Sequence, residues 1–327
     1  MNLLASMRYL LALNEHRHFG RAAQACHITQ PALSNALKAL EQEFGVVIVQ
    51  RGRTYAGLTH EGERVLLTAQ RMVREREILQ DELNSGASRP QGSLRLGAVP
   101  TAVPVLAHFA ALLHARHPGI SPVVRSMSSP EIEADLDRLA LDMGLGYTDR
   151  LGERGLRLEA TPQYSERYYF VHRATQGPPV SADAAHVRGP ARGDSISWRD
   201  AAEHPLCLLT PEMHNRTIVD SALAIAGVQV RPAIETNSVL ALASSVVAGR
   251  VATILPAALL DMLHGYGELR ALPLKSPDVV TPVGFLVNPE ARSSRLMLAA
   301  LALAREEGWL AQAARVGMAT VGSPDAA

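Results

Sequence analysis

Aromatic and cysteine residues are scarce in this chain of 327 residues. Aromatic side chains make up 4% of the sequence, and there are two cysteines. A surface that stacks the bases of single-stranded nucleic acid needs several aromatic rings, so this binding mode is excluded as a main function. Cys26 and Cys207 lie far apart in apolar stretches, which argues against a disulfide framework and favours a reducing cytoplasm.

Long hydrophobic runs and an overall charge are also missing. No uninterrupted apolar stretch reaches membrane-spanning length, and Arg8 and Glu15 occupy the region where a secretory signal would be apolar. The 32 basic and 32 acidic residues cancel, which excludes nucleic-acid binding by bulk charge. The only lysines are Lys38 and Lys275, which we attribute to a compositional bias towards arginine. We expect a cytoplasmic protein with no membrane partner.

Catalytic and metal-binding signatures are absent from the sequence. Histidine pairs at positions 16/18 and 114/117 have no third ligand at a metal-binding spacing. The glycines of residues 144–146 form neither a dinucleotide fingerprint nor a phosphate loop, and no Gly-x-Ser-x-Gly elbow occurs. We therefore predict no metal, no cofactor and no enzyme activity.

The most informative segment that is present spans residues 19–38, FGRAAQACHITQPALSNALK. It predicts two short helices joined by a tight turn, and the second helix opens with Pro31. The apolar residues of this second helix recur at helical spacing and are predicted to pack inward. They are Leu33, Ala36, Leu37, Leu40 and Phe44.

The opposite face of this helix carries amide, hydroxyl and amine groups, with no acidic residue before Glu41. Such a face suits hydrogen bonds to base edges and phosphates in a DNA major groove, although a solvated surface helix has the same pattern. The predicted DNA contacts from this element are Thr29, Gln30, Pro31, Ser34, Asn35 and Lys38.

Residues 44–59, FGVVIVQRGRTYAGLT, predict a strand, a turn and a second strand. A helix-turn-helix followed by such a hairpin is a winged helix. Arg51 and Arg53 in its turn are predicted to reach backbone phosphates or the adjacent minor groove. Residues 1–60 hold six Arg or Lys against three Glu, so we expect DNA affinity to fall with increasing salt.

A long helix is predicted from about residue 60 to residue 83, with Thr59 as its N-cap. Its apolar residues step by four and three, a heptad seam interrupted by Arg76. This spacing favours pairing with a second copy of the chain over packing on its own domain. The predicted dimerisation residues are Val65, Ala69, Met72, Leu79 and Leu83. Residues 84–90, NSGASRP, are predicted to form a flexible hinge.

From Gly92 onward, short apolar strands alternate with helices, which predicts βαβ units on parallel sheets. The expected strands span residues 93–99, 121–127, 143–147, 205–210, 230–237, 251–256 and 278–288. The expected helices span residues 101–118, 129–142, 211–227, 238–249 and 293–309. Residues 173–194 are rich in Pro, Gly and Ala and are predicted to form a mobile surface loop.

Hydroxyl residues follow three of these strands, at the points where helices are expected to begin. Helix N-termini bind anions, and the carboxyl ends of parallel strands face the ligand crevice, so we expect a hydroxyl-lined anion site there. Capping of a helix is the alternative role for each residue alone. The predicted effector-binding residues are Thr101, Ser128, Ser129 and Thr210, with His214 and Arg216 as secondary, cationic candidates. Helix-end electrostatics favour a small carboxylate and leave a neutral or aromatic ligand open.

Residues 1–66 resemble the DNA-binding domain of LysR-type transcriptional regulators, and a weaker similarity extends over nearly the whole chain. The matching positions are Phe19, Ala22, Ala23, Thr29 to Ser34, Leu40-Glu41, Phe44-Gly45, Arg51, Leu58-Thr59 and Glu61-Gly62. Cys26, Val49 and Gln50 depart from the family pattern. The resemblance implies an α/β protein with an N-terminal winged helix-turn-helix, a long linker helix and a C-terminal two-lobed periplasmic-binding-protein-like effector domain.

The implied organisation has five parts. They are a winged helix-turn-helix at 1–59, a linker and dimerisation helix with hinge at 60–89, effector subdomain I at 90–163 and 268–310, effector subdomain II at 164–267, and a flexible tail at 311–327. The implied partners are double-stranded promoter DNA, a small-molecule effector, further copies of the chain in a homodimer or tetramer, and RNA polymerase, at the nucleoid. A solute-binding sensor without specific DNA binding and an α/β enzyme stay open as alternatives. The sequence identifies neither the effector nor the target genes.

Overall fold

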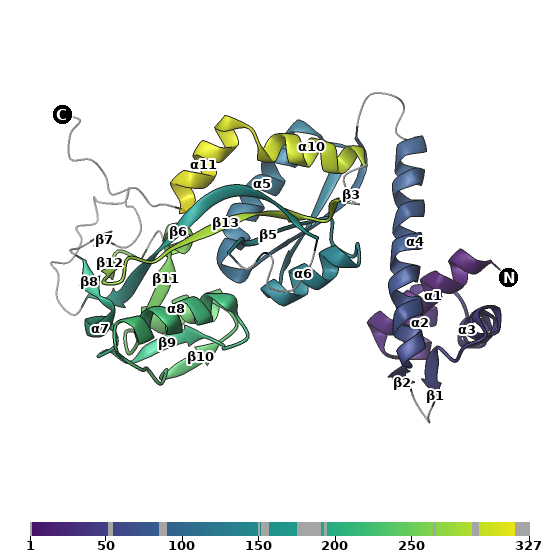
Figure 1. Ribbon diagram of the computed structural model, residues 1–327, viewed down its shortest axis with the longest axis horizontal. Coiled ribbons are helices and arrows are strands. Elements are labelled where there is room, and N and C mark those ends of the chain that lie inside the picture. The colour runs from purple at the N-terminus through teal and green to yellow at the C-terminus, as the bar shows by residue number, and fades with distance from the viewer. Residues whose placement is uncertain are drawn as a thin grey trace. The chain divides into compact units, whose positions relative to one another are not determined.

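The computed structural model describes residues 2–51, 55–84, 90–149, 151, 157–174, 191–192, 195–263, 266–289 and 294–317. The chain divides into two compact units, one formed mainly by Met1–Gln91 and one mainly by Gly92–Ala327. Figure 1 shows the elements of both units. Arg53, the hinge residues 85–89, most of the predicted loop at 173–194 and the end of the predicted tail lie outside the described residues.

The N-terminal unit is a winged helix-turn-helix followed by one long helix, as predicted. Its elements are α1 (Leu3–His16), α2 (Phe19–Ala25), α3 (Gln30–Phe44), β1 (Val49–Arg51), β2 (Tyr55–Leu58) and α4 (His60–Asn84). Thr29 caps α3 because its hydroxyl accepts a hydrogen bond from the Ala32 N–H at 3.4 Å. Gly45 ends α3 in the left-handed region, at φ 66°, which a glycine adopts without steric cost.

The apolar face of α3 packs into the core of this unit. Leu33, Leu37 and Leu40 are buried there, as predicted, among residues of α1, α2, β1 and α4. Phe44 was predicted to join them, but its side chain is 42% exposed. Phe44 is the last residue of the helix, one turn beyond the part of α3 that the core covers.

The base of the wing is tied to the start of α4. The Glu41 carboxylate accepts hydrogen bonds from the Ile48 and Val49 N–H groups at 3.0 and 3.1 Å. The Thr59 N–H donates to the Ile48 carbonyl oxygen at 3.0 Å. A Cβ added to Gly62 would lie 2.1 Å from that same oxygen, so only glycine permits this close approach.

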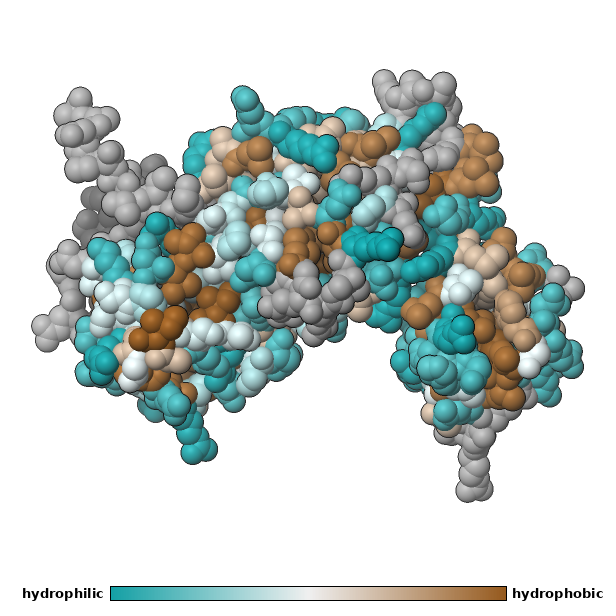
Figure 2. Space-filling view, in the orientation of Figure 1, coloured by the Kyte–Doolittle hydropathy of each residue, from teal (hydrophilic) through white to brown (hydrophobic). Residues whose placement is uncertain are grey.

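The predicted seam of α4 divides into two parts. Ala69 is fully buried in the core of its own unit, so it is not available to a second copy, and Val65 is partly buried against that core. Met72, Leu79 and Leu83 are 39%, 55% and 72% exposed. Figure 2 shows the hydrophobic surface at the C-terminal end of α4. The seam therefore begins about two turns later than its sequence spacing indicates.

The C-terminal unit has two lobes built on one continuous set of strands, with the order β10-β9-β11-β6-β13-β5-β3-β4. The first lobe contains β3 (Gly92–Ala98), η1 (Pro100–Ala102), α5 (Val103–Arg116), β4 (Ile120–Ser126), α6 (Ser129–Asp137) and β5 (Met143–Tyr147). The second contains β7 (Ala191–Arg192), β8 (Ile196–Ser197), α7 (Trp198–Ala201), β9 (Leu206–Leu209), α8 (His214–Ile225), β10 (Ile234–Thr236), α9 (Val239–Val247), β11 (Ala252–Pro256), η3 (Ala257–Leu263) and β12 (Leu269–Lys275).

Two long strands, β6 (Glu159–Arg173) and β13 (Val280–Val287), connect the lobes. They pair with each other antiparallel, and β13 also pairs with β5, while the later half of β6 pairs with β11 and β12 (Figure 1). The predicted boundary at residue 268 is wrong by one strand. β12 pairs with residues 169–173 of β6 and contributes Leu269 and Ala271 to the core of the second lobe.

The single C-terminal helix predicted at 293–309 is two helices, α10 (Arg295–Ala304) and α11 (Glu307–Gly317). Trp309 and Ala313 of α11 are buried in the core of the first lobe, and the Trp309 indole N–H donates to the Gln163 side-chain oxygen. Residues 311–317, predicted to belong to a flexible tail, are therefore part of the fold, because an apolar face of α11 packs against the sheet.

Candidate DNA interface and effector cleft

The polar face of α3 is available on the surface of the N-terminal unit. Gln30, Pro31, Asn35 and Lys38 are exposed, and Ser34 is half-buried. Glu41, the first acidic residue along the helix, is held by the backbone amides of the wing base, so its charge is compensated within the domain. The face before it presents hydrogen-bonding groups and one ammonium, which suits a major groove lined by phosphates.

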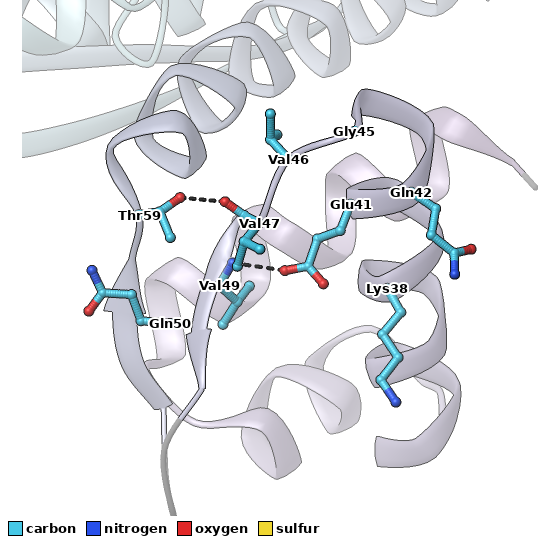
Figure 3. A pocket seen from close by; sticks show the side chains of 9 residues that line it. All are labelled: Lys38, Glu41, Gln42, Gly45, Val46, Val47, Val49, Gln50 and Thr59. Atoms are coloured by element: carbon cyan, nitrogen blue, oxygen red, sulfur yellow. Dashed lines mark hydrogen bonds between the residues drawn. The ribbon is translucent and has the colours of Figure 1, made fainter.

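A shallow groove of about 630 Å³ lies between the C-terminal half of α3 and the base of the wing. Figure 3 shows Lys38, Glu41 and Gln42 on its helix side and Gln50 and Thr59 on its strand side. Lys38 belongs both to this groove and to the polar face of α3, so the two surfaces adjoin. Arg51 ends β1.

The C-terminal unit encloses a small cavity between its lobes, with a volume of about 10 Å³. This space suffices for about one water molecule. Residues of both lobes line it, and they are Val99, Pro100, Thr101, Ser128, Ser129, Tyr147, Leu209, Met213, His214 and Asn215. Four of the six predicted effector-binding residues are among them: Thr101, Ser128, Ser129 and His214.

A buried network of hydrogen bonds forms one wall of this cavity. The hydroxyl groups of Thr101 and Tyr147 lie 2.9 Å apart, and the Asn215 side-chain amide donates to the Tyr147 hydroxyl at 3.3 Å. The Tyr147 hydroxyl lies 3.4 Å from a carboxyl oxygen of Glu166 on β6. Since Asn215 belongs to the second lobe and Thr101 to the first, this network joins both lobes to a connecting strand.

Glu166 is fully buried, and Tyr164 also contacts its carboxyl group, at 3.3 Å. Burial raises the pKa of Glu166 to about 8, although the hydrogen bonds from Tyr164 and Tyr147 oppose that effect. Burial also raises the pKa of Tyr147 well above its ordinary value. At neutral pH both groups are therefore predominantly uncharged.

The Ser129 hydroxyl is buried without a hydrogen-bond partner. Ser129 is 6% exposed and is the first residue of α6. Nearby, His214 packs edge-on against the Tyr147 ring at a centroid distance of 5.0 Å, and its Nε2 atom lies 3.6 Å from an oxygen of Asp149. A buried polar group without a partner is costly, so the Ser129 hydroxyl marks a position where a ligand atom would be favourable.

Two sequence expectations about the helix starts at this cleft are wrong in detail. Thr101 lies inside the turn η1 and contacts Tyr147, so it caps no helix. Thr210 was expected to lie directly before a helix, but α8 begins only at His214. The Thr210 hydroxyl donates to the Glu212 carboxylate at 2.7 Å. Thr210 therefore lies outside the cavity lining.

Arg216 does not face the cavity, because it is used within the second lobe. Its guanidinium donates to Asp220 at 2.8 Å, to Glu235 at 2.6 Å and to the Leu209 carbonyl oxygen at 2.9 Å. A cation already paired with two carboxylates of its own lobe is a poor partner for a carboxylate effector, and Arg216 is not among the residues that line the cavity. The expectation of a cationic partner at this position is therefore wrong.

Sequence reasoning missed Tyr147, Asn215 and Glu166. A signal existed for the last, because Tyr164, Glu166 and Tyr168 alternate along a strand and so share one face. No local pattern marks Asn215, which lies within an ordinary amphipathic helix. Among the residues that the structure describes, no group of three metal-binding side chains occurs and no helix is long and apolar enough to cross a membrane.

Comparison with known proteins covers both units. The family described as "Bacterial regulatory helix-turn-helix protein, lysR family" matches residues 4–63, and "LysR substrate binding domain" matches residues 87–309. The chain is 33% identical over 140 residues to the DNA-binding transcriptional dual regulator OxyR of Escherichia coli (strain K12), which covers 42% of this chain and 46% of that protein. The chain thus spans about half the length of the first curated relatives it matches.

Longer matches are weaker in identity. The uncharacterized HTH-type transcriptional regulator YnfL of Escherichia coli (strain K12) is 27% identical over 312 residues, 91% of this chain and 98% of that protein. Full-length OxyR from Pseudomonas aeruginosa superposes with a TM-score of 0.66 at 24% identity, covering 92% of this chain and 97% of that chain. Full-length CbnR in complex with its target DNA superposes with a TM-score of 0.64 at 19% sequence identity, covering 92% of this chain and 98% of that chain. The fold is therefore shared.

The two matched regions coincide with the winged helix-turn-helix and the two-lobed unit. The chain belongs to the LysR family of DNA-binding transcriptional regulators, which are not enzymes, and it carries the effector-binding domain of that family.

Proposed function

We propose that a small molecule bound between Thr101, Ser129 and Asn215 changes how this regulator binds its promoter. The observation that supports this most directly is the buried, unpartnered Ser129 hydroxyl in a cavity lined by both lobes. The ligand that uses this hydroxyl contacts both lobes at once. It shifts the lobe equilibrium only to the extent that it binds one arrangement more tightly than the other.

We also propose that the polar face of α3 reads base edges and that the wing contacts the phosphate backbone. The residues in these roles are Thr29, Gln30, Pro31, Ser34, Asn35, Lys38, Arg51 and Arg53. Exposure of Gln30, Asn35 and Lys38 on one face supports the first role. The regulator then acts at promoter DNA in the cytoplasm, as a homodimer or a tetramer, together with RNA polymerase.

Peroxide sensing through a thiol is not part of this proposal, although several relatives are named as hydrogen peroxide-inducible genes activators. A peroxide-reactive cysteine needs an accessible thiolate. Burial raises the pKa of both thiols, Cys26 and Cys207, and Cys207 is fully buried. Neither cysteine lines the cleft.

Replacing Ser129 with Ala tests the cleft. A thermal-shift screen of small metabolites on the full-length chain identifies ligands, and we expect Ser129→Ala to weaken their binding about tenfold while promoter binding without ligand is unchanged. The variant folds normally, because the hydroxyl has no partner in the protein. Ser121→Ala, on the exposed edge of β4, is the matched control. Ligands that bind Ser129→Ala as tightly as the parent would show that the site lies elsewhere.

A further inference from the structure

The cleft opens into a wider space of about 320 Å³ at its mouth. This mouth shares Pro100, Ser128 and Met213 with the inner cavity, so the two spaces adjoin. Its other lining residues are Ser126, Met127, Glu131, Glu212 and Asn237. Among the described residues that line either space, two are carboxylates and none is Lys or Arg.

The two carboxylates come from opposite lobes. Glu131 belongs to α6 of the first lobe, and Glu212 precedes α8 of the second. Both are exposed, and a hydrogen bond from Thr210 lowers the pKa of Glu212. Two like charges on facing lobes oppose closure of the cleft, and a cation between them would remove that repulsion.

The groups expected to bind an anionic ligand already have partners within the protein. The Ser128 N–H and hydroxyl both donate to the Glu131 carboxylate at 2.8 Å, so the protein's own acid caps the start of α6. Arg216 is engaged by Asp220 and Glu235. A negative charge of the chain itself therefore already lies at the start of α6, which disfavours a second anion there.

The buried Ser129 hydroxyl supplies an independent indication that a ligand enters this space. It is more than nine-tenths buried, lines the inner cavity and has no partner in the protein. The mouth adjoins the inner cavity, so a ligand that reaches this hydroxyl from the mouth lies beside both carboxylates.

We propose that the effector of this cleft carries an amine or amidinium group, held at the mouth by Glu131 and Glu212, and extends a hydrogen-bonding end to Ser129. This proposal rests on the proposed function and names the ligand class. The effector bridges carboxylates of the two lobes, so it favours the closed arrangement.

Three four-carbon probes of different charge test the ligand class on the full-length protein: butylamine, butyramide and butyrate. At millimolar concentration, butylamine should raise the thermal midpoint and butyrate should not. Glu131→Gln and Glu212→Gln should each weaken butylamine binding about tenfold, and the double variant should abolish it. The amide oxygen that Glu131→Gln introduces still accepts the capping bonds, so α6 is preserved. Glu203→Gln, an exposed acid outside the cleft, is the control.

Three results would each overturn the cationic class. They are a thermal shift with butyrate in place of butylamine, no shift with any of the three probes, and butylamine binding that survives the double variant. A wrong assignment of the effector site would give a different result from a wrong ligand class. If butyrate binds and Ser129→Ala removes that binding, the cleft is the effector site and only the ligand class is wrong. If butylamine binds, its binding is lost in the Glu131→Gln/Glu212→Gln double variant, and promoter binding does not change, the cleft binds amines but is not the effector site.

Discussion

At the scale of single residues, Glu166 is the most unusual group in the C-terminal unit. Its carboxyl group is fully buried on β6, one of the two strands that connect the lobes. Its neighbours are the hydroxyl groups of Tyr147 and Tyr164. These hydroxyl groups donate to the carboxyl group and favour its anion, but burial favours the neutral form and outweighs them.

The pKa of Glu166 predicts how stability depends on pH. The ordinary value of 4.5 rises to about 8 in the folded state. The native protein therefore binds more protons than the unfolded chain between these values, and the free energy of unfolding falls as pH rises from about 4.5 to about 8. One pKa unit corresponds to about 1.4 kcal/mol, so the loss amounts to a few kcal/mol.

Glu166→Gln should remove this pH dependence and raise the unfolding free energy at pH 8 by a few kcal/mol. Urea unfolding of the protein at several pH values between 5 and 8 measures how the free energy of unfolding of the C-terminal unit depends on pH. The pKa values of Tyr147, Tyr164 and Tyr168 are also raised by burial, so these groups titrate above the window. Glu203→Gln serves as the control, and an unchanged slope in Glu166→Gln would contradict the assignment.

At the scale of single elements, the recognition helix α3 is the part that the sequence predicts best. The spacing of Leu33, Leu37 and Leu40 fixes its buried face, and Thr29 and Gly45 fix its ends through local chemistry. Such features depend on neighbours in the chain, so sequence alone reveals them. The role of its polar face in DNA contact remains a prediction.

Gln30→Ala should relax base preference without changing the fold, because Gln30 is exposed at the start of α3. Loss of one bidentate base contact costs about 1–3 kcal/mol of discrimination. Binding to a specific promoter fragment and to a scrambled duplex, measured over a series of salt concentrations, separates this effect from general affinity. Gln42→Ala, at the other end of the same helix, is the control. Equal losses on both duplexes would assign Gln30 to phosphate contact.

The helix starts at the cleft could be predicted only in part from the local sequence. Ser129 begins α6 as predicted, but Thr210 lies upstream of α8 and Thr101 lies within a turn. Each of these two hydroxyl groups has a side-chain partner, Glu212 in one case and Tyr147 in the other. The Tyr147 partner is distant in sequence, so only the folded chain could reveal that bond.

At the scale of the whole molecule, the alternation of strands and helices and the return of the chain to the first lobe were predicted, and the strand at which it returns was not. The strand predicted at 143–147 has the same bounds as β5, Met143–Tyr147. Placement of β12 depends on its pairing with β6, about 100 residues earlier in the chain. Hydrophobic periodicity shows that a strand forms and does not show which sheet edge it joins.

The exposed end of α4 is expected to hold two copies of the chain together. Leu79→Glu combined with Leu83→Glu should convert the dimer to a monomer, because charged groups would be buried in an apolar seam. Both leucines are exposed in the single chain, so its own stability should change by less than about 1 kcal/mol. Sedimentation velocity over a range of concentrations measures the change, with Arg64→Glu on the same helix as the control. A double variant that stays dimeric would place the main interface elsewhere.

The joint between the wing and α4 has a mechanical consequence. The Ile48 carbonyl oxygen accepts a hydrogen bond from Thr59 and occupies the place that any side chain at position 62 would need. The base of β1 and the first turn of α4 are therefore packed in direct backbone contact. A helix of 25 residues is roughly 38 Å long, so it works as a lever rooted in the wing. We expect a tilt of α4 to be transmitted to the base of the wing.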